Sequence, residues 1–396
     1  MPKEGFKMDN CKVDAFVRDN GEMGIRNYIL VLSSVVCANR VVDIIDERSD
    51  CENLITITHQ HGCSQAGQDK EQTVRTLQGI VAHPNVGAAL VIGLGCETVK
   101  PDELIAPAAE KGKPCQTLMI QEEGGVKNTA KKGVNLTKKF RKKIITSRSP
   151  VNLENITVGV ECGGSDAFSG ITANPAVGAA ADLIVEKNGT VILSEVPEMI
   201  GAEHILAERC VNETVREKLI SVVESYEEKA LDAGIDIREA NPSPGNKSGG
   251  ITTLEEKSLG CIYKGGSTPI KQVVDYGESA NEDGLIIMKT PGNDVESITG
   301  MAAGGAQIIV FTTGRGTPVG CAVAPTLKVS TNSKVFNEMQ NDIDLNAGKM
   351  IDEDLSKNEM GKKIFKELLQ VIEGKKPRSE KLGQFDFSIN RIGPTF

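Results

Sequence analysis

The sequence predicts an α/β protein with two Rossmann-like or flavodoxin-like domains and mainly parallel sheets. Short β-branched runs alternate with helical patterns, many runs end in a polar, glycine-rich cluster, and the pattern restarts after a basic segment in mid-chain. Strands that alternate with helices of this length form right-handed βαβ units, whose strands lie parallel. Their nearly continuous apolar character fits sheets covered on both faces.

In the first half of the chain, each predicted strand precedes a predicted helix. The first strand opens the segment 27–40, and the others cover 54–63, 88–97 and 116–125. The expected helices cover 39–48, 69–84, 101–112 and 126–144.

A basic run over 138–150 ends at Pro150 and is interpreted as a helix end and linker. We therefore expect an N-terminal α/β domain over 1–149 and a C-terminal α/β domain over 150–396. Strands are predicted there over 157–162, 190–195, 284–289 and 307–314, and helices over 174–189, 203–233 and 356–373. The tail 375–396 lacks periodicity and is expected to wrap over a surface.

Composition excludes several classes of protein. The 396 residues carry a net charge of −9, which argues against nucleic acid or an anionic membrane as the main partner. No apolar run approaches the ~18 residues of a transmembrane helix, and the first residues have no apolar signal-peptide core. The ten cysteines contain no CxxC pair, which excludes a zinc ribbon. Free thiols and a cytoplasmic location are expected.

Polar and reactive side chains gather where predicted strands end. Ligands of open parallel sheets bind beyond the carboxyl ends of the strands, because loops and helix N-termini converge there. This pattern indicates an active site without identifying its chemistry. The strand-end residues are His59, His61, Cys63, Cys96, Glu97, Gln121, Glu122, Glu161, Cys162, Asp166, Glu195, Glu198, Thr290, Asn293, Asp294 and Arg315.

Three glycine-rich segments are candidates for holding an anionic substrate. The turn 162–170 offers successive backbone N–H groups, the loop 312–320 offers a guanidinium, and the loop 241–250 offers a lysine. A purely conformational role for the glycines is the alternative. No Walker motif or early GxGxxG motif supports nucleotide binding. The residues predicted to bind substrate are Gly163, Gly164, Ser165, Asn174, Asn246, Lys247, Arg315, Gly316 and Thr317.

Histidine and cysteine raise the question of a metal site. His59 is a candidate ligand because a cysteine and carboxylates are expected near it; hydrogen bonding is the alternative role. Cys63, Cys96 and Cys162 either hold iron together or are small buried residues in tight turns. Six further cysteines are interpreted as packing residues: Cys11, Cys51, Cys115, Cys210, Cys261 and Cys321.

Ordered motifs along the chain resemble the large region of altronate and galactarate dehydratases, to which the large subunit of sulfolactate sulfo-lyase is related. These include THQHGC, IGLGCE, ECGGSDAFSGITANPAVGAA, NPSPGNKSGGITTLEEKSLG, TPGND and ITGMAAGGAQIIVFTTGRGTP. The resemblance runs from about Val13 to Gly393. It implies a hydro-lyase that converts a 2,3-dihydroxy sugar acid to a 2-keto-3-deoxy acid with a divalent metal, Fe²⁺ or Mn²⁺. It also implies a separate small subunit of about a hundred residues, and we expect a homo-oligomer.

That reaction removes a weakly acidic proton next to a carboxylate, so the enediolate needs a metal or cationic donors. It also needs a base and an acid. We expect His59, Cys63, Glu97 and Glu195 as metal ligands and His59 or Lys247 as base. Arg315 and Lys247 would hold the substrate carboxylate, and Asp166 and Asn174 its hydroxyls.

Three alternatives remain at this point. A mononuclear metal is favoured over an iron–sulfur cluster because the cysteines lack a CxxC element and oxygen ligands are plentiful. A sulfolactate-type or other 2-hydroxy-acid lyase is a second reading of the same residues. A sugar-acid-binding scaffold without catalysis is the third.

Overall fold

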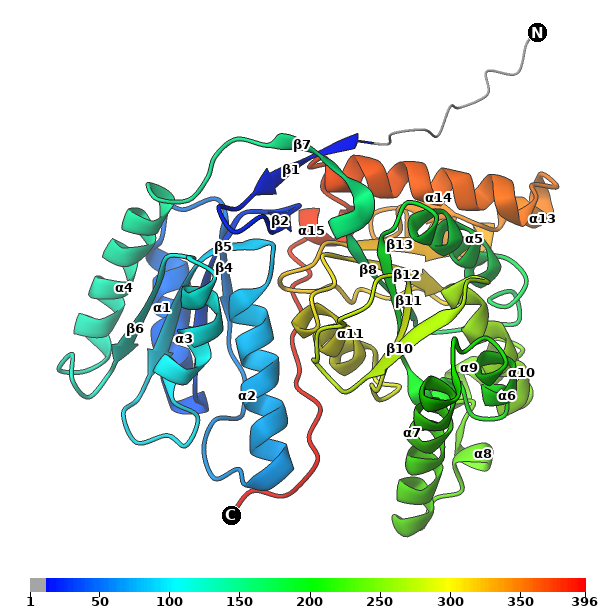
Figure 1. Ribbon diagram of the computed structural model, residues 1–396, viewed down its shortest axis with the longest axis horizontal. Coiled ribbons are helices and arrows are strands. Elements are labelled where there is room, and N and C mark those ends of the chain that lie inside the picture. The colour runs from blue at the N-terminus through cyan, green and yellow to red at the C-terminus, as the bar shows by residue number, and fades with distance from the viewer. Residues whose placement is uncertain (1–11) are drawn as a thin grey trace, which may run out of the picture.

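The computed structural model describes residues 12–396 and contains two parallel sheets, which confirms the predicted α/β class (Figure 1). The smaller sheet has the strand order β4-β3-β5-β6 and the larger one β10-β11-β9-β8-β12-β13-β14. All pairs within these two sheets are parallel. Each sheet therefore collects its carboxyl ends at one edge, where a site can form.

The four-stranded sheet uses the elements that the sequence predicts for the first half. Its strands are β3 (Tyr28–Ser33), β4 (Leu54–Ile57), β5 (Val86–Gly93) and β6 (Cys115–Met119). The short helix η1 (Val36–Ala38) is followed by α1 (Asn39–Arg48), and α2 (Gly67–Ala82), α3 (Pro101–Glu110) and α4 (Val126–Arg141) complete the helices.

The seven-stranded sheet contains predicted strands and others that the sequence did not reveal. Its strands are β8 (Thr157–Cys162), β9 (Thr190–Leu193), β10 (Ile270–Val274), β11 (Leu285–Met288), β12 (Ile308–Thr313), β13 (Thr326–Ser330) and β14 (Leu345–Asn346). Around it lie η2 (Leu153–Asn155), α5 (Ala173–Val185), η3 (Val196–Glu198), α6 (Glu203–Ala207), α7 (Glu213–Asp232), α8 (Ile237–Ala240), α9 (Pro244–Ser248), α10 (Leu254–Ile262), η4 (Tyr263–Gly265), α11 (Asp294–Ala303), α12 (Ser333–Glu338), α13 (Lys349–Asp352), α14 (Lys357–Ile372) and α15 (Arg378–Lys381).

A small antiparallel sheet bridges the start of the chain and its middle. It consists of β1 (Lys12–Val17), β2 (Met23–Gly24) and β7 (Ser149–Asn152). Residues on both sides of the expected boundary near Pro150 therefore pair with the beginning of the chain. The division into domains 1–149 and 150–396 stays a prediction, and residues 1–11, Cys11 included, lie outside the described residues.

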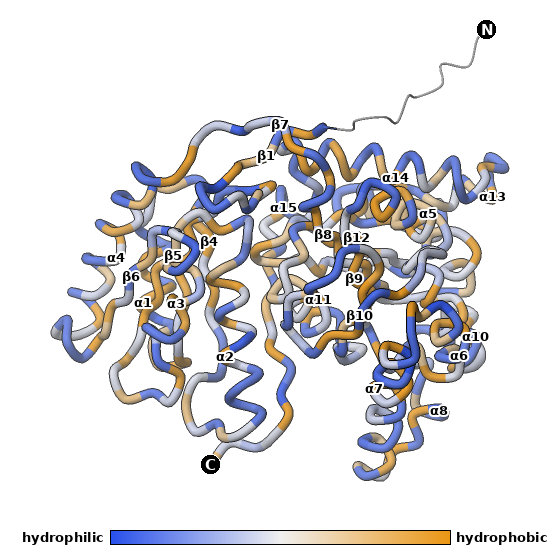
Figure 2. Tube along the Cα trace, in the orientation of Figure 1, coloured by the Kyte–Doolittle hydropathy of each residue, from blue (hydrophilic) through white to orange (hydrophobic). Residues whose placement is uncertain are grey.

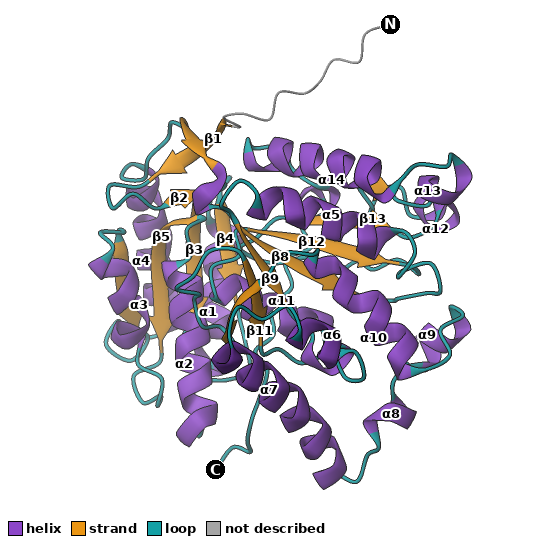
Figure 3. Ribbon diagram, turned by 45° about the vertical axis from the view of Figure 1, so that its right-hand side comes forward, coloured by secondary structure: helices purple, strands orange, loops and turns teal. Residues whose placement is uncertain are grey.

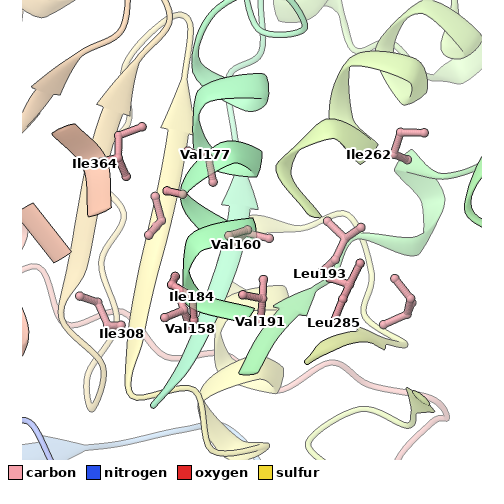
Figure 4. Packing of buried hydrophobic residues seen from close by; sticks show 14 of the residues in the cluster. Val158, Val160, Val177, Ile184, Val191, Leu193, Ile262, Leu285, Ile308 and Ile364 are labelled. Atoms are coloured by element: carbon pink, nitrogen blue, oxygen red, sulfur yellow. The ribbon is translucent and has the colours of Figure 1, made fainter. Parts of the chain in front are cut away.

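Alternation along the buried strands builds cores on both faces of the sheets. Ile29 and Val31 of β3 pack with α1 and α4, whereas Leu30 and Leu32 face α2 and the core shared with α11. In the larger sheet, side chains of β8 and β9 pack against α5 (Figure 4). Figure 3 shows α5 and α14 side by side over this sheet.

Helices α2 and α11 join the two sheets through one apolar layer. They pack so closely that a Cβ added to Gly79 would lie 2.2 Å from the carbonyl oxygen of Ala303. Hydropathy follows this arrangement, with hydrophobic stretches along the inner strands and a hydrophilic surface on α7 (Figure 2). Among residues 12–396, no helix has the length and apolarity needed to cross a membrane.

Two sequence-based elements need correction. The helix predicted over 203–233 is two helices, α6 and α7, because the backbone between them bonds the start of β10: Ile270 N donates to Arg209 O and Val211 N to Ile270 O. The strand predicted over 54–63 ends at Ile57, and the chain then turns through Gly62, whose φ is +99°. The tail after α15 runs between α2 and α11 (Figure 1), and Ile389 in it is buried.

Candidate active site

A cluster of buried charged side chains lies at the carboxyl ends of β8 and β9. Glu161 and Cys162 end β8, and Glu195 and Glu198 follow β9; all four are buried. Glu195 adopts a left-handed conformation with φ +64°, and its N–H donates to Thr290 Oγ1 at 2.7 Å. A non-glycine residue in this region costs about 1–3 kcal/mol, and such residues concentrate at functional sites.

Helix α10 and the turn after it supply the opposing face. Lys257, Cys261 and Lys264 are spaced i, i+4 and i+7, so a helical path puts them on one side. Lys257 Nζ lies 2.6 Å from Glu198 Oε1, and Lys264 Nζ lies 2.5 Å from Glu195 Oε2. Lys264 is fully buried. The acids beyond the strands are therefore held by ammonium groups from α10 and η4.

Two groups of these side chains could hold a metal ion, and Glu195 belongs to both. In the first, ligand atoms of Cys162, Glu195, Glu198 and Cys261 all lie within 4.8 Å of one another. The second brings Glu161, Glu195 and Asp294 together under the same limit. The sulfur atoms of Cys162 and Cys261 are 3.8 Å apart.

The charges in this cluster do not balance. Four carboxyl groups face two ammonium groups, so two negative charges would remain if every acid were ionised. Burial, then the charge of Glu195, raises the pKa of Glu161 well above its usual range. Burial and the charges of Glu195 and Glu198 raise the pKa of Asp294 to about 7. Protons or a cation are needed to offset the surplus.

Glu198 behaves differently from the other acids. Burial raises its pKa, but the ammonium groups of Lys257 and Lys264 outweigh that effect and hold the pKa below the usual value. Lys264 shows the converse: burial lowers its pKa, but the facing cysteines, when ionised, and the carboxylates of Glu195 and Glu198 outweigh burial and raise it. Cys162 is held as a thiol by its contact with Cys261 and by burial, which both raise its pKa.

One carboxylate oxygen in the cluster lacks a donor. Glu161 Oε2 accepts from Ser194 Oγ at 2.9 Å and from Ser297 Oγ at 2.7 Å. Glu161 Oε1 is buried and has no hydrogen-bond partner among the described residues. A proton on this atom would let it donate to Glu195, and a cation between the two carboxylates would satisfy it equally.

An open cavity of about 490 Å³ adjoins the cluster, a volume typical of small-molecule sites. Glu198, Lys257 and Asp294 line it from the charged cluster, together with Cys162. A second, more apolar cavity of about 240 Å³ also reaches Cys162 and Lys257. Cys162 and Lys257 of the charged cluster thus line both cavities.

Six of the predicted substrate-binding residues line the larger cavity, and the others do not. Those that line it are Gly163, Gly164, Ser165, Asn246, Arg315 and Gly316. Arg315 Nη1 donates to Gly245 O at 2.7 Å, which ties the loop after β12 to α9. Lys247 lies exposed on α9, and neither it nor Thr317 lines the cavity.

Asp166 and Asn174 take part in internal hydrogen bonds. The Asp166 carboxylate accepts from Thr331 Oγ1 at 2.9 Å and from Asn332 Nδ2 at 3.0 Å. Asn174 Nδ2 donates to Gly260 O, and its oxygen accepts from Thr312 Oγ1. Both residues line the smaller cavity, but these bonds mainly fix the loops around the site.

Of the four predicted metal ligands, only Glu195 belongs to either group described above. His59 Nε2 lies 2.7 Å from Ser33 O, and His59 Nδ1 accepts from the N–H of His61, so both ring nitrogens are occupied. Glu97 accepts from Gly95 N at 2.6 Å and from Ser34 Oγ at 3.0 Å. Cys63 is exposed.

The sequence-based interpretation missed three residues of this site. Cys261 was interpreted as a packing residue but lies beside Cys162, and Lys257 and Lys264 received no role. Their signal is the i, i+4, i+7 spacing in a segment that was not predicted as a helix. Glu198 and Asp294 were noted at strand ends only. Cys63 and Cys96 are exposed and share no such group with Cys162 within residues 12–396.

Two family models together match nearly the whole chain. Residues 15–144 match the second domain of D-galactarate dehydratase/altronate hydrolase, and residues 153–395 match the C-terminal region of D-galactarate/altronate dehydratase.

Curated relatives agree with these matches. An altronate dehydratase of Bacillus subtilis is 36% identical over 98% of this chain and 80% of its own length. A galactarate dehydratase (L-threo-forming) of Escherichia coli is 34% identical over 95% of this chain and 74% of its own. The β subunit of (2R)-sulfolactate sulfo-lyase from Chromohalobacter salexigens is 31% identical over 95% and 96%. The chain therefore belongs to the D-galactarate/altronate dehydratase family and is a hydro-lyase.

Proposed function

We propose that the cavity beside Glu195 and Glu198 binds a sugar acid and eliminates water from its 2,3-dihydroxy acid portion to give a 2-keto-3-deoxy acid. The observation that carries this proposal is the surplus of buried carboxylates next to a cavity that also contains Arg315. Relatives named altronate and galactarate dehydratase support the substrate class.

Arg315 is the group that we assign to the substrate carboxylate. Its guanidinium lines the cavity, and its Nε and Nη2 donors remain beyond Nη1, which donates to Gly245 O and Ser248 Oγ. The glycine-rich turn after β8, with Gly163 and Gly164, lines the same cavity, and a substrate can approach its backbone closely. Asn246 and Ser165 are the nearby polar residues that we assign to hydroxyl groups.

Proton transfer is assigned to side chains that line the cavity. Lys257 and Glu198 form an ion pair there, so a carboxylate and an ammonium group lie together on one wall of the cavity. We propose Glu198 as base for the proton next to the carboxylate and Lys257 as the cation that stabilises the enediolate. The earlier assignment of the base to His59 or Lys247 stays a prediction.

The donor groups fit a divalent metal ion. Cys162, Glu195 and Cys261 would hold a metal with mixed sulfur and oxygen ligands, which suits Fe²⁺ better than Mn²⁺ and leaves Glu198 of the same group as the base. A charge of +2 would offset part of the negative charge of the carboxylates and of the thiolates that metal binding requires. When bound, the ion would supply Lewis-acid stabilisation of the enediolate. Two cysteines in the described group offer too few thiolates for a typical four-cysteine iron–sulfur cluster.

An alternative function is elimination of sulfite, and one observation favours it. The chain is also 31% identical to the β subunit of a (2R)-sulfolactate sulfo-lyase. The same comparison supports a separate small partner chain, and we also propose a homo-oligomer. The nine described cysteines are free, as expected for the reducing cytoplasm, where we propose that the enzyme works.

A substrate screen with purified protein tests the proposal. The protein is loaded with Fe²⁺ or Mn²⁺ without oxygen and incubated with D-altronate, galactarate or sulfolactate, with and without a candidate small partner. Formation of a 2-keto-3-deoxy acid from a sugar acid supports the proposal, and sulfite from sulfolactate supports the alternative. Neither product in any combination would contradict both.

A further inference from the structure

A separate cavity of about 300 Å³ lies beyond the carboxyl ends of β10 and β11. Helix α2 forms one wall, α7 another, and the C-terminal segment that runs past α2 in Figure 1 forms the third. No lining residue is shared with the candidate active site. The lining residues are Gln68, Glu71, Gln72, Arg75, Tyr226, Lys229, Asp275, Tyr276, Lys289, Asn390 and Ile392.

Two lysines, Lys229 and Lys289, line this cavity. Lys229 and Lys289 form no ion pair with any residue in the described part of the chain. Partial burial, then the charge of Lys289, lowers the pKa of Lys229. The Lys229 ammonium rests 5.6 Å from the ring centre of Tyr226. Bringing two like charges together at one cavity is unfavourable unless an anion joins them.

The remaining walls supply further donors. Arg75 uses its Nε to bond Tyr276 O at 2.9 Å, and its terminal nitrogens form no hydrogen bond within residues 12–396. Gln72 Nε2 donates to Asn390 O at 2.6 Å, which fixes the C-terminal segment as a wall. Glu71 and Asp275 also line the cavity, but neither forms an ion pair with these cations. The cations therefore keep donors available for a ligand.

We propose that this cavity binds a small oxyanion, a carboxylate or a phosphate group, between Lys229 and Lys289. Its volume accommodates a small anion with a few attached atoms. Gln68 and Asn390 line the same cavity, and their side-chain amides suit hydroxyl groups on the same ligand. The ligand would contact α2, α7 and the C-terminal segment at once, and thus link the two sheets.

Calorimetric titration tests the proposal with two probes, inorganic phosphate and D-gluconate, on the full chain. We expect saturable binding of at least one probe, and which one binds distinguishes a phosphate ligand from a sugar-acid ligand. Lys229→Met, Lys289→Met and the double variant should weaken binding about tenfold or more, as expected for the loss of charge-assisted hydrogen bonds. Lys271→Met, an exposed position on β10 outside the cavity, is the matched control.

Two results would overturn the proposal. One is no saturable heat with either probe, provided that circular dichroism shows folded protein. The other is binding that persists in the double variant and disappears in Arg315→Met, which would assign the anion to the candidate active site. This test requires no turnover, so its failure is distinguishable from failure of the proposed function.

Discussion

The polar residues at the strand ends of the two parallel sheets have different kinds of partner. At the four-stranded sheet, His59 and Glu97 are satisfied by backbone groups and Ser34, without a charged partner. At the seven-stranded sheet, Glu195 and Glu198 bond lysines, and Glu161 keeps an oxygen without a donor. The first arrangement is complete as it stands, whereas the second needs protons or a cation. Polar residues at strand ends are therefore not equivalent evidence for chemistry.

Breaking the buried ion pair at the seven-stranded sheet should give the largest effect. Glu195→Gln leaves the Lys264 ammonium buried without its partner, which typically costs about 3–5 kcal/mol. We expect that loss in urea unfolding of the metal-free protein, together with loss of turnover. Glu353→Gln, which breaks the exposed pair with Lys349, is the control and should change stability by less than about 1 kcal/mol. Equal effects of both substitutions would contradict the role of burial.

Arg315 and Lys247, the two cations predicted to hold the substrate carboxylate, should differ in their effect on turnover because only one of them lines the cavity. Arg315 lines the candidate cavity, and Lys247 is exposed outside its lining. Arg315→Met should raise KM for the sugar acid by roughly 10–100-fold, the usual loss for a charge-assisted bond of about 1.5–3 kcal/mol. Lys247→Met should leave kcat/KM within about threefold. The reverse order in steady-state kinetics would move the substrate carboxylate towards α9.

Acid should destabilise the protein through a buried neutral histidine that packs the smaller sheet against the larger. His83 Nε2 lies 3.0 Å from Ala306 O, and burial lowers the pKa of His83 to about 3. The unfolded chain binds the proton near pH 6.5, so this contribution to stability is present above pH 6.5 and is lost as the pH falls.

The expected loss at pH 5 is about 2 kcal/mol from His83 alone. His83→Gln should therefore reduce the fall in unfolding free energy between pH 7 and pH 5. His204→Gln, at an exposed position, should leave that fall unchanged. Urea unfolding at several pH values measures the fall in unfolding free energy for both variants. An unaltered fall in His83→Gln would show that the His83 ring is protonated in the folded protein or that other groups dominate the pH dependence.

Much of the fold was predictable because buried strands are continuous apolar runs. The strand 157–162 coincides with β8, and the glycine-rich turn after it does line the cavity. β10 and β13 were missed because IKQVV and TLKVS carry polar residues inside short strands. Lys328 in β13 is buried only because Thr317 O and Gln384 Oε1 accept from its ammonium group, and those partners are not adjacent in sequence.

Only the part of the candidate site that lies at strand ends was predictable from the sequence. Glu195 and Cys162 follow apolar runs, which places them at the sheet edge without any structure. Cys261 is 99 residues from Cys162, and no local pattern reports that contact. For His59, the sequence does not reveal that Ser33 O and the N–H of His61 contact its ring nitrogens, and its role as a ligand stays a prediction.

The most direct test of the account is the metal content of two cysteine variants. Protein purified without oxygen and loaded with Fe²⁺ is compared for wild type, Cys261→Ala and Cys63→Ala, with folding checked by circular dichroism. We expect Cys261→Ala to lose most of the bound iron and Cys63→Ala to retain it, because only Cys261 belongs to a group of ligands at the seven-stranded sheet. Loss of iron in Cys63→Ala with retention in Cys261→Ala would contradict the account and move the metal centre to the four-stranded sheet.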